Sequence, residues 1–152
     1  MPVPLFADSA RDKAVMLSQT SLAAAMEMME RANRVIIGIG GLSTSPGDAS
    51  SALGDPAAVA ALHQAGARAE ILGQFLKSDG SPLTSDTDQR VMAPTLASLR
   101  GREVVAIAGG ETKTEAILAA LRSGLLTGLI IDETTARRLV NVVDVDLATA
   151  AE

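Results

Sequence analysis

The sequence predicts an α/β fold with a mainly parallel sheet flanked by helices. Two apolar runs rich in β-branched residues, 35–41 and 104–110, both end in glycines, and a third, 129–131, follows a segment with helical periodicity. Strands that alternate with helices are typical of parallel sheets, so we expect helices on both faces of the sheet. Ligands on such sheets bind at the carboxyl ends of the strands, where both glycine runs fall.

The chain has 152 residues, which suits one domain with a single core. No apolar run approaches the roughly 20 residues that a membrane helix requires, and the N-terminal residues lack the pattern of a signal peptide. We therefore expect a cytoplasmic protein with no membrane partner. The sequence contains no cysteine, which excludes disulfides, a thiol nucleophile and a Cys-based zinc site.

The net charge of −5 argues against binding of nucleic acid by this chain, because affinity for phosphate backbones comes mainly from clustered Lys and Arg. The 13 basic residues are scattered, and Phe6 and Phe75 are the only aromatic residues. The chain therefore has too few aromatic residues to form a surface on which bases or sugar rings stack. Recognition by charge and hydrogen bonds remains open.

In the first half of the chain we expect helices at 9–17 and 21–31, followed by the strand 35–41. The second helix carries an apolar stripe that we expect to fill the core, made of Leu22, Ala25, Met26 and Met29. The polar segment 42–55 fits a loop that lies over a pocket or in solvent. Asp55 is a suitable N-cap for a helix at 56–63.

The second half continues with the run 67–76 and a hairpin turn at Asp79-Gly80. After the strand 104–110, a helix at 111–122 should turn Ile117, Ala120 and Leu121 inward. Asp132 fits the N-cap of a last helix at 134–140, and residues 144–152 are expected to form a frayed tail.

Neither glycine run matches a nucleotide-binding motif. Gly38, Gly40 and Gly41 fail the G-x-G-x-x-G spacing because position 43 is Ser, and Lys113 lacks the preceding glycine of a P-loop. His63 is the only histidine, so a His-based metal site or a Ser-His-Asp triad lacks parts. The sequence implies no cofactor and no metal.

The turn at Gly109-Gly110 joins a strand to a helix whose first turn contains Lys113. Free backbone N–H groups at a helix N-terminus and the helix dipole together favour an anion. A lysine there opposes the dipole by up to about 1 kcal/mol, so helix stability does not explain it. Lys113 either points into solvent or meets a negatively charged ligand.

Two further charged residues have open roles. Glu70 lies in a small, apolar neighbourhood and is either a solvated strand residue or a carboxylate directed into a pocket to accept hydrogen bonds from hydroxyl groups. Arg90 follows the acids Asp86 and Asp88 and is either paired with a neighbouring acid or in contact with a ligand.

Individually weak motifs follow one another in a fixed order across about residues 4–140: Pro4-Leu5-Phe6, 35–40, Gly66 with 70–73, Asp79-Gly80, 88–91, 108–110 with Lys113, and 132–136. This ordered set resembles the effector-binding domain of SorC-type sugar-responsive bacterial transcriptional regulators. The resemblance implies a Rossmann-like fold similar to the ribose-5-phosphate isomerase and glucosamine-6-phosphate deaminase group. It also implies that this fold senses phosphorylated sugars instead of converting them.

In such regulators an acid in the segment that matches 70–72 and the lysine that matches Lys113 contact the effector. The resemblance thus implies that Glu70 accepts sugar hydroxyls, that the backbone near Leu72 adds a contact and that Lys113 meets an effector oxygen. The expected effector site is completed by Gly40, Arg90, Gly109 and Gly110. The family commonly has Asp where Glu70 stands, which changes the reach of the carboxylate by one methylene.

Family members carry a helix-turn-helix, and then a first strand and helix of the sensor with a loop that helps to hold the phosphate. This sequence has none of these, so we expect the C-terminal part of a sensor that contacts DNA only through an absent domain. An exposed apolar sheet edge would favour a homo-oligomer, a dimer or tetramer. Two alternatives stay open: a sugar-phosphate isomerase or deaminase with Glu70 and Lys113 as acid and base, and a remnant that binds no ligand.

Overall fold

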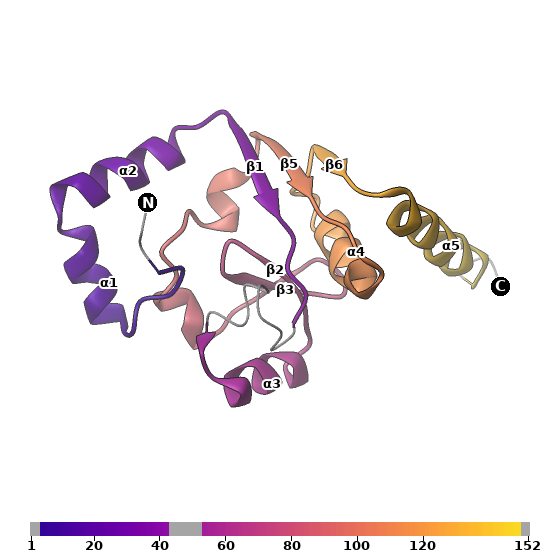
Figure 1. The fold of residues 1–152 in the computed structure, drawn as a ribbon, viewed down its shortest axis with the longest axis horizontal. Coiled ribbons are helices and arrows are strands. Elements are labelled where there is room, and N and C mark those ends of the chain that lie inside the picture. Colours follow the sequence, from indigo (N-terminus) through magenta and orange to yellow (C-terminus); the bar gives the residue numbers. More distant parts are fainter. Residues whose placement is uncertain (1–3, 43–52, 150–152) are drawn as a thin grey trace.

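A computed structural model describes residues 4–42 and 53–149, and in this part of the chain the strands form two sheets (Figure 1). The first sheet is parallel, in the order β1-β5-β6, and the second is an antiparallel meander, β2-β3-β4. The strands are β1 (Arg34–Gly38), β2 (Ala67–Ile71), β3 (Gln74–Lys77), β4 (Pro82–Leu83), β5 (Glu103–Ile107) and β6 (Gly128–Ile130). The predicted parallel α/β core is confirmed, with an antiparallel hairpin unit beside it.

The two sheets are joined just beyond the end of β1. The backbone N–H of Gly40 donates to the carbonyl of Glu70 at 2.9 Å, and the N–H of Glu70 donates to the carbonyl of Gly40 at 2.8 Å. The chain therefore leaves the parallel sheet and pairs with β2 in the antiparallel direction. This junction places the segment just after β1 against the carboxyl end of β2.

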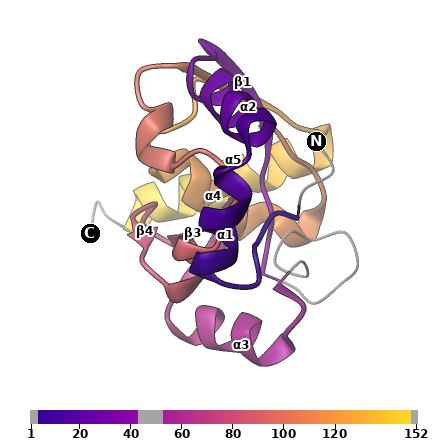
Figure 2. The ribbon, with the colours of Figure 1, turned by 90° about the vertical axis from the view of Figure 1, so that its left-hand side faces the viewer.

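The helices begin close to where local capping chemistry predicts. Ser9 Oγ accepts the N–H of Asp12 at 3.1 Å, and Asp55 Oδ1 accepts the N–H of Ala57 at 2.8 Å. The helices are α1 (Ala10–Leu17), α2 (Thr20–Glu30), α3 (Pro56–Gln64), α4 (Thr114–Arg122) and α5 (Glu133–Thr149), with short 3₁₀ turns η2 (Asp86–Gln89), η3 (Leu96–Leu99) and η4 (Glu111–Lys113). Figures 1 and 2 show α3 at the opposite end of the molecule from β1 and α2.

The last helix is longer than predicted. We expected a frayed tail from residue 144, whereas α5 runs to Thr149. The residues after Val140 include no glycine or proline, so no strong breaker ends the helix there. In Figure 1, α5 extends away from the strands on the side opposite to α1 and α2.

The main core surrounds α4. Five successive residues of this helix, Ala116–Ala120, are buried, which is the pattern of a helix enclosed on all sides. They pack with Ile37 of β1, Val104 of β5 and Ile71 of β2, so α4 lies against both sheets. Leu121, which we predicted to face inward, is 42% exposed.

One face of the parallel sheet is not covered in the described part of the chain. Ile36, Ile107 and Ile130 are 66%, 52% and 56% exposed. Strand register places all three on the face opposite to α4, because Ile107 stands beside both Gly38 and Ile130. The prediction that helices cover both faces is therefore wrong for the described residues. We call Ile36, Ile107 and Ile130 the isoleucine face.

The two N-terminal helices lie to one side of the sheet (Figure 1), although we expected the apolar stripe of the second helix to fill the core. Leu22 is buried with Ala7 and Met92, but Met29 belongs to the exposed hydrophobic residues. Arg102 Nη1 donates to the carbonyls of Met29 and Ala32, at 3.2 Å each, and holds the end of α2 at the sheet margin. The predicted core role of the α2 stripe is thus correct for Leu22 and wrong for Met29.

A membrane-spanning helix and a metal site each have requirements that can be compared with the described residues. Over residues 4–42 and 53–149, no helix combines the length and the apolar character that crossing a bilayer requires. The same residues contain no group of three or more His, Cys, Asp or Glu side chains suited to hold a metal ion.

Candidate functional site

Glu70 is a buried acid on β2, with 4% of its surface exposed. Its Oε1 accepts the backbone N–H of Gly73, and its Oε2 lies against Gly40, where an added Cβ would stand 2.6 Å from that oxygen. A buried carboxylate requires such hydrogen bonds to offset its desolvation. The open alternative of a solvated strand residue is therefore wrong, and Glu70 points into the molecule at the junction of the two sheets.

A two-residue turn follows Ile71, at the end of β2, and was not predicted from the sequence. Ile71 pairs with Gln74, so Leu72 and Gly73 form the turn, with φ of +53° and +77°. Positive φ at both positions is typical of a type I′ hairpin. A leucine in this conformation costs about 1–2 kcal/mol, and nothing local in the sequence indicates it. The Glu70 carboxylate stabilises the turn through Gly73.

The Gly109-Gly110 turn follows β5, and both glycines are exposed, so the turn is open to ligands. The N–H of Gly110 donates to Thr135 Oγ1 at 3.0 Å and to Asp132 Oδ2 at 3.2 Å. The N–H of Lys113 donates to the carbonyl of Gly110 at 3.0 Å. Our expectation of free donors is therefore wrong for these two amides. The amides of Glu111 and Thr112 precede the first bond within the helix and have no acceptor in it.

Asp132 and Thr135 at the start of α5 hold this turn. Thr135 is fully buried, and its hydroxyl donates to Asp132 Oδ2 at 2.6 Å while its N–H donates to Oδ1 at 2.9 Å. These two bonds, and a third from Gly110, lower the pKa of Asp132 from its usual value of 3.8 to about 2. Asp132 is thus an ionised N-cap, as predicted, but its contact with the glycine turn was not foreseen.

The parallel register brings the two glycine runs to one edge of the sheet. Gly38 pairs with Ile107, so the residues that follow each strand, including Gly40 and Gly109, leave the sheet at the same carboxyl edge. Glu70 contacts Gly40 directly. Lys113, half-buried at the junction of η4 and α4, belongs to the same turn as Gly109.

Arg90 lies beside the hairpin turn through its backbone. Its carbonyl accepts the N–H of Ala7 at 2.8 Å, and the next residue, Val91, packs beneath Gly73, where an added Cβ would lie 3.2 Å from Val91 Cγ2. The segment of Arg90 therefore adjoins the turn at Leu72 and Gly73. A contact between its guanidinium and an effector stays a prediction.

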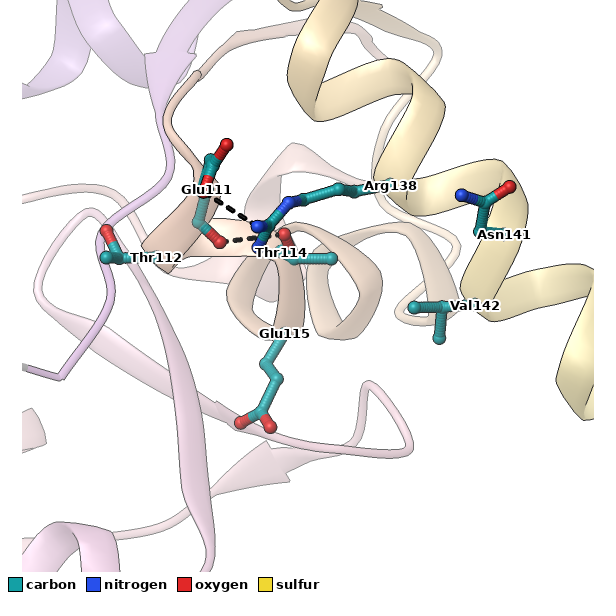
Figure 3. Close-up of a pocket in the computed structure, with 7 residues that line it drawn as sticks. All are labelled: Glu111, Thr112, Thr114, Glu115, Arg138, Asn141 and Val142. Atoms are coloured by element: carbon teal, nitrogen blue, oxygen red, sulfur yellow. Dashed lines mark hydrogen bonds and ion pairs between the residues drawn. The ribbon is translucent and has the colours of Figure 1, made fainter.

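A pocket of about 420 Å³ lies between α5 and the start of α4, beside the glycine turn (Figure 3). It is lined by Glu111, Thr112, Thr114, Glu115, Arg138, Asn141 and Val142. Figure 3 shows Arg138 reaching from α5 to Glu111, with 2.7 Å between Nη2 and Oε2. Sequence analysis did not identify this pocket, because it depends on how α5 is placed against η4.

A parallel sheet with glycine turns at its carboxyl edge, and a buried acid beside them, defines an α/β ligand-binding domain. Residues 1–141 match the family described as "Putative sugar-binding domain". The chain therefore belongs to this sugar-binding domain family, which is found in SorC-type transcriptional regulators.

Two curated relatives are transcriptional regulators. The erythritol catabolism regulatory protein EryD of Brucella abortus (strain 2308) is 36% identical over 140 residues, which are 92% of this chain and 44% of EryD. The transcriptional regulator LsrR of Klebsiella pneumoniae is 31% identical over 144 residues, which are 92% of this chain and 45% of LsrR. The chain thus spans less than half the length of each.

Solved structures have the same fold. A domain of a possible sugar-binding transcriptional regulator from Arthrobacter aurescens TC1 superposes with a TM-score of 0.79 at 30% identity, over 92% of this chain and 54% of that chain. The full-length sorbitol operon regulator SorC from Klebsiella pneumoniae superposes with a TM-score of 0.82 at 19% identity, over 91% and 46%. The second similarity shows the fold alone.

Proposed function

We propose that this chain is the effector-sensing domain of a SorC-type transcriptional regulator and that its effector is a phosphorylated sugar. In this proposal the chain performs no chemistry, and a helix-turn-helix domain outside it contacts DNA in the cytoplasm. The family membership supports the proposal, and the observation that carries it is the buried carboxylate of Glu70 beside the glycine-lined carboxyl edge.

The proposed roles follow from the chemistry of each group. An ionised carboxylate has about four acceptor positions, so Glu70 can hold Gly73 and still accept hydrogen bonds from sugar hydroxyls. Lys113 and the amides of Glu111 and Thr112 would meet the anionic oxygens. Close approach of the sugar is favoured by the lack of side chains at Gly40, Gly109 and Gly110, and further contacts would come from the backbone of Leu72 and from Arg90.

Calorimetry and thermal shift with a panel of sugar phosphates and the matching free sugars test this proposal. A phosphorylated ligand at 100 times its Kd should stabilise the protein by about 2.7 kcal/mol. Lys113→Gln and Glu70→Gln should each weaken binding by about tenfold or more, because charge-assisted hydrogen bonds are lost. Lys77→Gln is the matched control, since Lys77 is exposed at the far end of the β2-β3 hairpin.

The outcomes separate the candidate functions. Stabilisation without turnover supports sensing, and conversion of the sugar phosphate in the same assay would support an isomerase or deaminase. Preference for the free sugars would overturn the phosphorylated class, and no response to any ligand would support a remnant without a ligand.

We also propose that the domain forms a homo-oligomer through the isoleucine face, with a second copy as the occupant. Parallel sheets are normally covered on both faces, and three exposed isoleucines leave this face apolar. Arg34 and Glu103, which pair at 2.7 Å between Nε and Oε2, lie at one end of the same face. In a two-fold symmetric dimer, Arg34 of one copy can face Glu103 of the other copy. The face can therefore be complementary to itself.

A further inference from the structure

The first turn of α5 and the glycine turn are joined by a closed set of hydrogen bonds. The Thr135 hydroxyl accepts the N–H of Gly110 and donates to Asp132 Oδ2, and that same oxygen accepts the N–H of Gly110. A hydroxyl has a single donor, so its orientation is fixed by this arrangement. Thr135 is fully buried, and therefore water does not readily replace the partners of its hydroxyl.

This contact sets the conformation of the glycine turn. Gly110 has φ of +104°, a region that side chains disfavour, and a Cβ on Gly109 would stand 2.6 Å from Asp132 Oδ2. Both glycines are thus shaped by residues more than 20 positions later in the chain. The glycine turn also determines where η4 begins, because the N–H of Lys113 donates to the carbonyl of Gly110.

We propose that Asp132 and Thr135 are positioning residues of the effector site: they hold the glycine turn so that Lys113 and the amides of Glu111 and Thr112 face the effector. The inference rests on the proposed function for its ligand. Because Asp132 and Thr135 occupy the amide of Gly110, that donor is withheld from the effector, and its anionic oxygens must bind at Lys113 and the next two amides.

The test compares Thr135→Val, which keeps the shape but removes the hydroxyl, with Thr135→Ser, which keeps the hydroxyl. Thr127→Val is the matched control, since Thr127 Oγ1 accepts the N–H of Val104 at 2.9 Å, at the amino-terminal end of β5 and away from the glycine turn. Amide hydrogen exchange by NMR reads the turn without a ligand. Exchange at Gly110 should rise by about tenfold in Thr135→Val and stay near wild type in Thr135→Ser and Thr127→Val.

Calorimetry with glucose 6-phosphate, and with inorganic phosphate as a second probe, reads the site. Thr135→Val should weaken binding of the probe by about tenfold, while Thr135→Ser and Thr127→Val stay within about twofold of wild type. Recovery in the serine variant distinguishes a role of the hydroxyl from a general loss of stability.

Two results would overturn the inference: unchanged exchange at Gly110 in Thr135→Val, or increased exchange there with unaltered affinity for the probe. If the wild-type protein binds neither probe, this result counts against the proposed function and not against the role of Thr135, and exchange at Gly110 alone then decides whether Thr135 holds the turn.

Discussion

Gly40 and Glu70 exchange two backbone hydrogen bonds, of 2.9 and 2.8 Å, and the Glu70 carboxylate lies against the α-carbon of Gly40. The contact connects the segment just after a parallel strand to the carboxyl end of an antiparallel one. Because Gly40 has no side chain, the acid can occupy the space beside it and remain buried. The position of the acid in the candidate site is thus set by a glycine on another strand.

Gly40→Ala should therefore displace the Glu70 carboxylate. The new methyl group would stand 2.6 Å from Oε2, and relief of this overlap should cost about 1–3 kcal/mol of unfolding free energy. Binding of the sugar phosphate should weaken with it. Gly41→Ala is the control, since a Cβ there meets no atom within 4 Å. Urea unfolding and calorimetry measure the two effects, and equal behaviour of both variants would contradict the assigned contact.

The stability of the protein should fall at acidic pH because Asp132 becomes protonated. Its pKa is lowered from 3.8 to about 2 in the folded state, so the unfolded chain binds more protons between these pH values. The stabilisation is present above about pH 4 and is lost as the pH falls toward 2. The difference in Tm between wild type and Asp132→Asn should narrow over this range.

Glu133→Gln serves as the control for Asp132→Asn, because it removes an exposed negative charge at the start of the same helix. A constant Tm difference for Asp132→Asn from pH 5 to pH 2 would refute the role of its hydrogen bonds in the pH dependence.

Local chemistry explains which parts of the fold were predictable. The predicted caps at Asp55 and Asp132 and the predicted turn at Asp79-Gly80 are correct because each depends on residues within a few positions. The strands that end in glycine are correct for the same reason. The carboxyl edge followed from the alternation of strands and helices, which a single sequence records directly.

Contacts between distant residues were not predictable from the sequence. Thr135 bonds to Gly110 across 25 positions, and a buried threonine gives no signal of that partner. The turn at Leu72 escaped detection because leucine seldom adopts positive φ. In the sequence, Ile36 has the pattern of a buried strand residue. Its exposure depends on where α1 and α2 pack. Periodicity indicates which residues are apolar but not which neighbour covers them.

Gly80 allows the turn after β3 to approach the end of α4 closely, and substitution of Gly80 should therefore lower the stability of the protein. A Cβ on Gly80 would overlap the backbone of Arg122 and Ser123 at the end of α4. Gly101 has nearly the same φ, +80° against +82°, but a Cβ there meets no atom within 4 Å. Gly101→Ala should cost about 1–2 kcal/mol from backbone strain alone. Gly80→Ala should cost about 1–3 kcal/mol more, measured by urea unfolding, and equal losses would exclude the contact with α4.

Ile107→Lys should convert the proposed oligomer into a monomer without unfolding it. Ile107 stands at the centre of the isoleucine face on the middle strand, where a charge would have to be buried between two copies. In the monomer the same side chain is half exposed, so the Tm at low concentration should change little. Val15→Lys, at 58% exposure on α1, is the matched control outside this face. Sedimentation velocity should show oligomers for wild type and Val15→Lys and monomers for Ile107→Lys, whereas a wild-type monomer at all concentrations would refute self-association through this face.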